Sequence, residues 1–309
     1  MEPRASNRRG STRRSVMKIS RHPVDMNVVE QWFTRDCKSF DSRLSNCINR
    51  IRGLTSFVSS CAQNVYLAGA VIAPDSPEVA RALRIAAQAL GAVFAFRLDP
   101  PPSEYPIGEG PPVCYPTPID PGICDILLWQ RAYHLSLITR QTIPLQYLCR
   151  VTKDTFKGSN LVGYDDEAYW FLELKQRAAQ ESGFAWEPLL LRCEAWEAKA
   201  VLTSKSIGLK MLKCLRIPYH RVLRRIGENS VSGLEAELTK AASLHKKYWA
   251  TPQKRAEDLN GMVSLPLVAL AALAWDRGMR FHVESDYLPW SWVTGELFNR
   301  VEVPKIVPK

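Results

Sequence analysis

Acidic and imidazole side chains are the first candidates for chemistry in this 309-residue chain. Asp165, Asp166 and Glu167 are consecutive, so they could bind a metal ion or act as acid and base beside a histidine. The five histidines, at positions 22, 134, 220, 245 and 282, have no His, Cys or Asp neighbour at metal-ligand spacing. Acids also favour the first turn of a helix, and we interpret the run as a helix start.

Catalytic and nucleotide-binding motifs are missing from the sequence. It contains no P-loop, no G-x-G-x-x-G, no G-x-S-x-G and no H-E-x-x-H. The eight cysteines never form a Cys-x-x-Cys pair, and most lie in apolar helical stretches, so we expect reduced core thiols in a cytoplasmic protein. The sequence predicts no cofactor and no metal, and it favours a binding protein over an enzyme.

Positive charge is concentrated in two segments of a chain whose net charge is +10. Residues 198–227 hold eight Lys or Arg and no acid. Such a block is a candidate surface for an acidic partner, and a solvated helix face is the alternative. The candidate contacts are Lys213, Arg216, Arg221, Arg224 and Arg225.

The other basic segment is the N-terminus, where residues 1–21 hold seven Lys or Arg against one acid. These residues mix Arg with Ser, Gly, Asn and Pro and offer little to bury, so the segment is predicted to be a disordered tail. It could contact nucleic acid or be an inert extension.

Hydrophobic periodicity predicts an all-α protein with a single multi-helix domain over 22–300, arranged as a bundle or an irregular helical array, and a C-terminal tail over 301–309. We expect helical pattern over 27–66 with a break near Gly53, and a helix that begins at Ser76 and Pro77. Further helices are expected over 123–140, 165–182, 188–204, 207–226 and 264–277. At most one short extended segment is expected, at Phe281-His282-Val283.

A proline-rich loop interrupts this pattern, with nine prolines in residues 99–122. Proline removes the backbone donor that a helix or a central strand requires. We expect the loop to lie across one domain, and a linker between two helical parts is the alternative.

The helix expected after Ser232 carries a histidine on its apolar side. Ser232 and Glu235 form a capping-box pattern, and the stripe that follows is Leu234, Leu238, Ala241, His245 and Tyr248. We therefore expect His245 to be a hydrogen-bonded core residue. The longest apolar run, 265–275, is too short for a membrane span and suits a buried helix, so no membrane partner is predicted.

Two blocks in the C-terminal third carry a resemblance. The first is ASLHKKYW (242–249), followed by RAED (255–258) and GMV (261–263); the second is ALAALAWDRG (269–278), followed by VESDYLP (283–289). This pattern closely resembles the immunity protein 49 family of bacterial polymorphic toxin systems, and weaker similarity extends over most of 77–289.

The resemblance implies a mostly helical cytoplasmic inhibitor without catalysis, which binds a cognate toxin such as a nuclease or another effector that acts in the cytosol. The matching positions also have roles in holding the fold, and we expect them to be structural. They are His245, Tyr248, Trp249, Asp276, Gly278, Glu284, Tyr287 and Pro289.

Three hypotheses of different class follow. The leading one is an immunity protein that sterically neutralises a cognate toxin and so protects the producing cell. The alternative is a nucleic-acid-binding protein that uses the basic tail and segment 198–227, with binding that weakens linearly in log salt. The third is a helical enzyme that uses Asp165, Asp166, Glu167 and a histidine.

Overall fold

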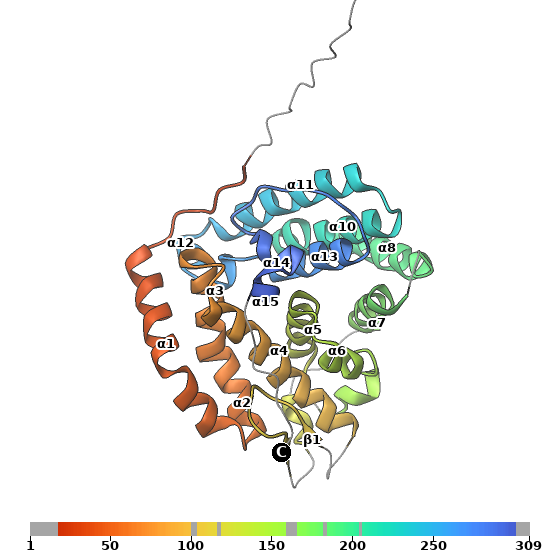
Figure 1. Cartoon of the computed structure of the whole chain (residues 1–309). Coiled ribbons are helices and arrows are strands. Elements are labelled where there is room, and N and C mark those ends of the chain that lie inside the picture. The colour runs from red at the N-terminus through yellow and green to blue at the C-terminus, as the bar shows by residue number, and fades with distance from the viewer. Residues whose placement is uncertain are drawn as a thin grey trace, which may run out of the picture.

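Helices account for most of the described chain, so the all-α prediction is confirmed (Figure 1). The computed structural model describes residues 18–99, 104–115, 119–158, 166–181, 184–203 and 206–300. The expected tail over 301–309 lies outside these ranges, as do the first seventeen residues of the expected tail over 1–21.

The N-terminal part of the fold is built from four helices. They are α1 (Met26–Cys47), α2 (Ile51–Phe57), α3 (Gln63–Ile72) and α4 (Pro77–Leu98), with a π-helical turn, η1 (Val58–Ala62), joining α2 to α3. The break lies at residues 48–50, a few residues before Gly53 and close to the expected position. Gly53 lies inside α2, where a Cβ would come within 3.2 Å of the Cys47 carbonyl oxygen, so its role is close packing rather than breaking the helix.

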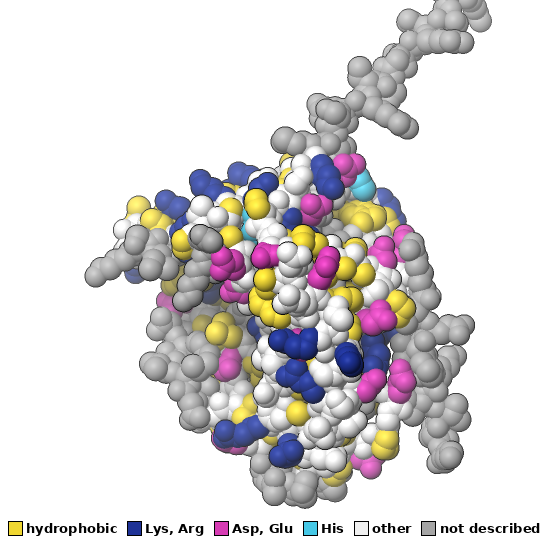
Figure 2. Space-filling view, turned by 90° about the vertical axis from the view of Figure 1, so that its left-hand side faces the viewer, with side chains coloured by type: hydrophobic (Ala, Val, Ile, Leu, Met, Phe, Trp, Pro, Cys, Tyr) yellow, Lys and Arg dark blue, Asp and Glu magenta, His cyan; other side chains and the backbone are white. Residues whose placement is uncertain are grey.

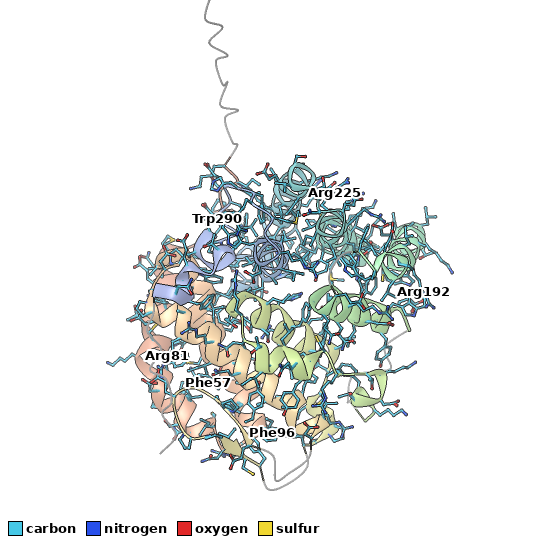
Figure 3. The ribbon with its side chains drawn as sticks, turned by 45° about the vertical axis from the view of Figure 1, so that its right-hand side comes forward. Phe57, Arg81, Phe96, Arg192, Arg225 and Trp290 are labelled. Carbon is cyan, nitrogen blue, oxygen red and sulfur yellow. The ribbon has the colours of Figure 1, made fainter. Side chains whose placement is uncertain are left out.

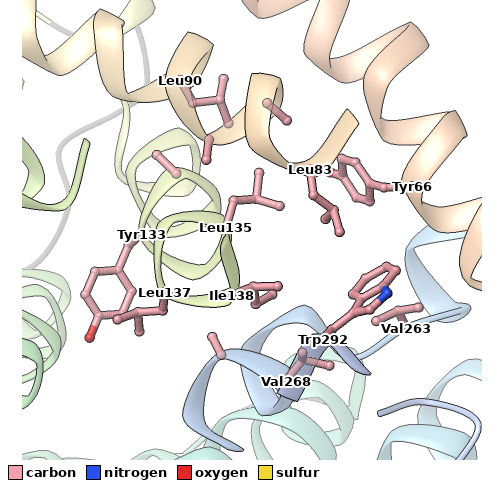
Figure 4. Close-up of a cluster of buried hydrophobic side chains, with 14 of the residues drawn as sticks. Tyr66, Leu83, Leu90, Tyr133, Leu135, Leu137, Ile138, Val263, Val268 and Trp292 are labelled. Atoms are coloured by element: carbon pink, nitrogen blue, oxygen red, sulfur yellow. The ribbon is translucent and has the colours of Figure 1, made fainter. Parts of the chain in front are cut away.

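Helix α4 begins as the sequence predicts and is buried along most of its length. The Ser76 hydroxyl accepts a hydrogen bond from the Val79 N–H at 3.3 Å, and Pro77 occupies the first turn. Figure 4 shows Leu83 and Leu90 of α4 above Leu135 and Ile138 of α5 (Ile126–Thr139). The buried apolar side chains form one connected cluster that runs from Ile19 to Phe298.

The proline-rich loop packs on α4 and contains the only sheet of the described residues. Strand β1 (Glu104–Tyr105) pairs antiparallel with β2 (Val113–Cys114), and a 3-10 turn, η2 (Pro121–Ile123), follows. Tyr105 and Tyr115 are buried, and the Tyr115 ring meets Phe96 of α4 edge-on at 4.8 Å. Residues 281–283, where one short extended segment was expected, are neither helix nor strand in the structure, and the pairing described next to them is the bridge between Ile19 and Ser285.

The middle of the chain runs through α5, α6 (Thr142–Leu148), the 3-10 turn η3 (Lys153–Phe156), α7 (Asp166–Gln180) and α8 (Glu187–Thr203). The next helix is continuous through α9 (Ser206–Met211), the π-helical turn η4 (Leu212–Arg216) and α10 (Ile217–Gly227). It packs beside α11 (Val231–Trp249) at the top of Figure 1.

Helix α11 begins at Val231, so the capping box expected at Ser232 was wrong. The Glu235 side chain does not turn back to its own helix. It accepts a hydrogen bond from the His282 N–H at 2.9 Å, a partner 47 residues away.

The last elements are α12 (Gln253–Ala256), the 3-10 turn η5 (Leu259–Gly261), α13 (Leu265–Asp276), α14 (Trp290–Thr294) and α15 (Glu296–Arg300). Helix α13 is buried nearly all round. The spans Pro77–Leu98 and Leu259–Asp276 are long and apolar enough to cross a membrane, but their most apolar windows are 83% and 72% buried in the protein, as in core helices.

Residues 18–22, here called the strap, lie against the C-terminal part of the chain. Ile19 is buried and pairs as a parallel bridge with Ser285, with Ile19 N–H to Glu284 O at 2.9 Å and Asp286 N–H to Ile19 O at 3.0 Å. The expected boundary at residue 21 is therefore too late, because Ile19 supplies apolar surface and backbone partners that the composition of the tail did not suggest.

Candidate functional site

The family-like residues of the C-terminal third come together around His245. Its side chain is buried, and its Nε2 lies 3.1 Å from the Gly261 carbonyl oxygen. The Tyr287 ring packs edge-on against it at 4.8 Å, and the Tyr287 hydroxyl accepts a hydrogen bond from the His22 N–H of the strap at 2.9 Å. Burial lowers the pKa of His245 to about 4, so the imidazole is neutral at pH 7. The expected core histidine is confirmed.

Tyr248 and Trp249 lie at the end of α11. The Arg255 guanidinium stacks 4.3 Å from the Tyr248 ring and donates to the Tyr248 carbonyl oxygen at 2.9 Å. A Cβ at Gly261 would come within 2.9 Å of the Trp249 ring, which explains a glycine at this position.

Asp276 and Gly278 lie at the end of α13. Asp276 Oδ1 accepts from Arg140 Nη2 at 3.1 Å, so it connects α13 to the end of α5. Gly278 adopts φ +85°, which favours glycine, and its N–H donates to the Trp275 carbonyl oxygen at 3.0 Å.

The two remaining positions of the motif contribute mainly backbone contacts. The Glu284 carbonyl oxygen accepts from Ile19, and its half-exposed carboxylate lies 3.7 Å from His282 Nε2. Pro289 precedes α14, and its carbonyl oxygen accepts from the Trp292 N–H at 3.1 Å. These contacts are compatible with the structural role expected for the motif, and that role stays a prediction.

The five candidate cations of the basic segment have different surroundings. Arg224 pairs with Glu194 of α8, with Nε–Oε1 at 3.0 Å, and Arg225 pairs with Glu228 at 2.7 Å. Arg216 is largely covered, because its guanidinium lies 3.9 Å from the Phe171 ring centroid, and burial lowers its pKa. Their side chains therefore have partners within the protein. Figure 3 shows Arg225 at the upper edge of the molecule and Arg192 of α8 at the right.

Lys213 and Arg221 are different, because both are exposed. Within the described ranges, no carboxylate lies at ion-pair distance from either one. On the face that carries α1, Lys and Arg side chains are instead interspersed with Asp and Glu (Figure 2). Lys213 and Arg221 are thus the two of the five candidates whose charge is available to a partner.

A buried hydrogen bond between a histidine and a carboxylate lies beneath the basic segment, and no local pattern was used to predict it. His220 Nδ1 lies 2.7 Å from Glu197 Oε1, and both side chains are almost fully buried. Burial lowers the pKa of His220, while the Glu197 carboxylate opposes the shift. The spacing of Leu190, Cys193 and Glu197 places Glu197 on the buried stripe of α8, which was a signal for this pair.

Lys175 of α7 is also buried, and it has no carboxylate partner among the residues that the structure describes. Its Nζ lies 5.2 Å from the centroid of the Tyr219 ring. Burial, with a smaller contribution from Arg216, lowers the pKa of Lys175 to about 7.

The acidic run lies at the start of α7, with Asp165 outside the described residues and Glu167 half-buried in the helix. In the described part of the chain, no group of three His, Cys, Asp or Glu side chains could hold a metal ion. All eight cysteines are free thiols. Cys114 is exposed on β2, so the expectation of core thiols does not extend to it.

A pocket of about 530 Å³ opens between α5, the η4–α10 helix, α11 and the start of α13. His134, His245 and Trp249 lie in its wall together with mainly apolar side chains. No local sequence pattern predicts this pocket, because its walls come from segments up to 200 residues apart.

A comparison with protein families agrees with the motif blocks. The model of the family described as immunity protein 49 matches residues 73–292, more than half of the chain, and the match covers α4 to α14. No curated protein and no solved structure matches. The chain belongs to the immunity protein 49 family, and membership of this family implies that it neutralises a toxin.

Proposed function

We propose that this protein neutralises its cognate toxin by binding it directly in the cytoplasm and covering the active site or the substrate channel of the toxin. The family match over residues 73–292 is the observation that carries this proposal. Immunity proteins of this kind are typically non-enzymatic, so inhibition by contact is the mechanism that fits. Tight inhibition requires an interface of roughly 1,600 Å² with a few anchor residues.

The helical scaffold supports steric inhibition because packed helices fix the positions of its surface side chains. Helix α13 packs beneath α10 and α11, and α8 packs against α10, so these helices hold their surface side chains in fixed positions. Lys213 and Arg221 extend from this layer with uncompensated charge. We therefore propose an acidic face on the toxin, because complementary charge accelerates association and aligns the partners.

Co-expression with the toxin encoded beside this gene tests the proposal. Cells that produce the toxin alone should die, and cells that also produce this protein should survive. The two proteins should then co-purify as a stable 1:1 complex.

Other outcomes would overturn the proposal in distinguishable ways. Survival without a complex would indicate that the protein reverses the damage rather than binding the toxin. Failure to rescue would leave the nucleic-acid alternative, which a gel shift at about 150 mM salt tests directly. The internal pairing of Arg224 and Arg225 leaves less free charge for that alternative than the sequence suggested.

A further inference from the structure

The pocket between α5, the η4–α10 helix, α11 and α13 has the composition of an anchor site. Most of its wall is apolar, including Leu67, Leu215, Pro218, Val263 and Leu265. At about 530 Å³ it is large enough for an aromatic side chain together with part of the backbone that carries it.

The charged side chains of the pocket wall are positive only. No Asp or Glu lines the pocket, and Arg131 of α5 is the one Lys or Arg that does. Arg131 Nη1 donates to the neutral Gln63 Oε1 at 2.6 Å, and no carboxylate of the described residues lies at ion-pair distance. The cation is therefore left for a ligand to compensate.

Two buried nitrogens of the wall have no hydrogen-bond partner among the described residues. They are His134 Nε2 and Trp249 Nε1, from α5 and α11. The His134 side chain is only 6% exposed. Both nitrogens have almost no accessible surface of their own, so they lie just behind the apolar wall rather than opening into the pocket. The Trp249 indole N–H is therefore a reporter of changes at the wall.

The surface around the pocket is apolar as well. Leu127, in the pocket wall, is 64% exposed, and Met211, one turn before Leu215, is 47% exposed. A free small ligand would not cover such side chains, whereas a protein partner would. Lys213 on the same continuous helix adds an exposed cation.

We propose that this pocket receives a large apolar side chain, preferably aromatic, from an acidic segment of the toxin, with a carboxylate of that segment reaching Arg131. The inference rests on the proposed function and adds to it the place and the chemistry of the anchor. Interfaces of this kind depend on a few side chains that fill pockets.

A matched pair of substitutions tests the anchor. Leu127 and Ile143 are both exposed, and each is the second residue of a helix, where an added carboxylate favours folding. Leu127 lies at the start of α5, and Ile143 lies in α6, which follows the other end of α5, about 18 Å along the helix axis from Leu127. Leu127→Asp should weaken toxin binding at least about 30-fold, because it places a polar, negative group at the mouth of the pocket. Ile143→Asp should change the affinity less than about threefold.

A small probe tests the pocket without the toxin. Indole-3-propionate carries an aromatic ring and a carboxylate, and it should shift the Trp249 indole N–H signal in ¹H–¹⁵N spectra, a signal assigned through Trp249→Phe. Arg131→Gln should weaken this response about tenfold, since it removes the charge and keeps a donor for Gln63.

The outcomes separate this inference from the function on which it rests. If the toxin binds the wild type and Leu127→Asp equally well, the anchor site is wrong and toxin binding stands. If the probe binds but Leu127→Asp has no effect on the toxin, the pocket serves a free aryl acid, which also overturns the proposal. If the wild type does not bind the toxin at all, the proposed function fails first and the anchor fails with it.

Discussion

Glu197 of α8 and His220 of α10 form a buried contact, with 2.7 Å between Glu197 Oε1 and His220 Nδ1. Removing one partner of such a pair leaves the other polar group buried and unpaired, which is more damaging than losing an exposed pair. We predict that Glu197→Ala lowers the free energy of unfolding by about 3 kcal/mol. Glu197→Gln should lower it by only about 1 kcal/mol, because its amide oxygen can still accept from His220.

Denaturant titration of the purified variants measures both values. The control is Glu194→Ala, which breaks the half-exposed pair with Arg224 and should change the free energy of unfolding by less than about 1 kcal/mol. Equal losses for Glu197→Gln and Glu197→Ala would show that the hydrogen bond does not matter.

Burial of Lys175 destabilises the folded protein, in contrast to the contact between Glu197 and His220, and the size of this effect depends on pH. Its pKa falls from the ordinary 10.5 to about 7 in the folded protein. Between these values the unfolded chain binds more protons, so the free energy of unfolding rises with pH, by up to about 1.4 kcal/mol per pH unit. Lys175→Met should remove this slope and stabilise the protein at pH 7.

Urea unfolding at pH 7, 8 and 9 checks this prediction for the wild type and Lys175→Met. The free energy of unfolding should rise more steeply with pH in the wild type than in Lys175→Met only between the two pKa values. Above pH 10.5 the lysine is deprotonated in both the folded and the unfolded state. Parallel stability curves for the two proteins would contradict it.

At the scale of elements, Arg140 connects the end of α5 to the C-terminal helices. Its φ of +55° is unfavourable for a residue with a Cβ. Its guanidinium nevertheless donates to the carbonyl oxygens of Trp292 and Val293, at 2.6 and 2.5 Å, and to Asp276. Arg140→Gly removes these hydrogen bonds and one to the Ile138 carbonyl oxygen, against about 1 kcal/mol of backbone relief. It should therefore destabilise the protein by about 2 kcal/mol.

The matched control is Asn229→Gly. Asn229 also has a positive φ, +51°, but it is exposed and its side chain has no hydrogen bond among the described residues. This substitution should leave the melting temperature within about 1 °C of the wild type, whereas Arg140→Gly should lower it by about 3 °C. Equal shifts in melting temperature for the two variants would show that backbone strain, rather than side-chain contacts, determines the effect at both sites.

The helices themselves could be predicted where local signals and burial agree. Ser76 with Pro77 marks the start of α4, and α13 ends at Asp276, with Gly278 just beyond its end as expected. Local signals failed where a distant partner takes the side chain. Glu235 bonds to the His282 backbone rather than capping its helix, and Ile19 pairs with residues of the C-terminal third.

At the scale of the whole molecule, fewer cations of the basic segment are available to a partner than the sequence suggests. Arg216, Arg224 and Arg225 are covered or paired, a result that depends on α7, α8 and Glu228 and that no local pattern contains. The pocket was unpredictable for the same reason, since its walls meet only in the folded chain. The sequence therefore predicted the segment that contains the candidate site, but only some of the residues in it.

Charge reversal tests which of these cations steer the toxin. The double variant Lys213→Glu, Arg221→Glu should slow association at low salt about tenfold, with a smaller effect at 0.5 M salt, because complementary charge acts mainly on the association rate. Lys38→Glu on α1 with Arg50→Glu just before α2 makes the same change in net charge at exposed positions. Surface plasmon resonance should show at most a twofold change for this control; equal slowing by both would mean that only net charge matters.

The central claim is inhibition by direct contact, and a titration of toxin activity with the purified protein tests it most directly. If the protein covers the toxin, activity should fall linearly and vanish at one molecule of protein per molecule of toxin. Full loss of activity at a small fraction of that ratio would indicate turnover, and undiminished activity at a large excess would show that the protein does not block the toxin.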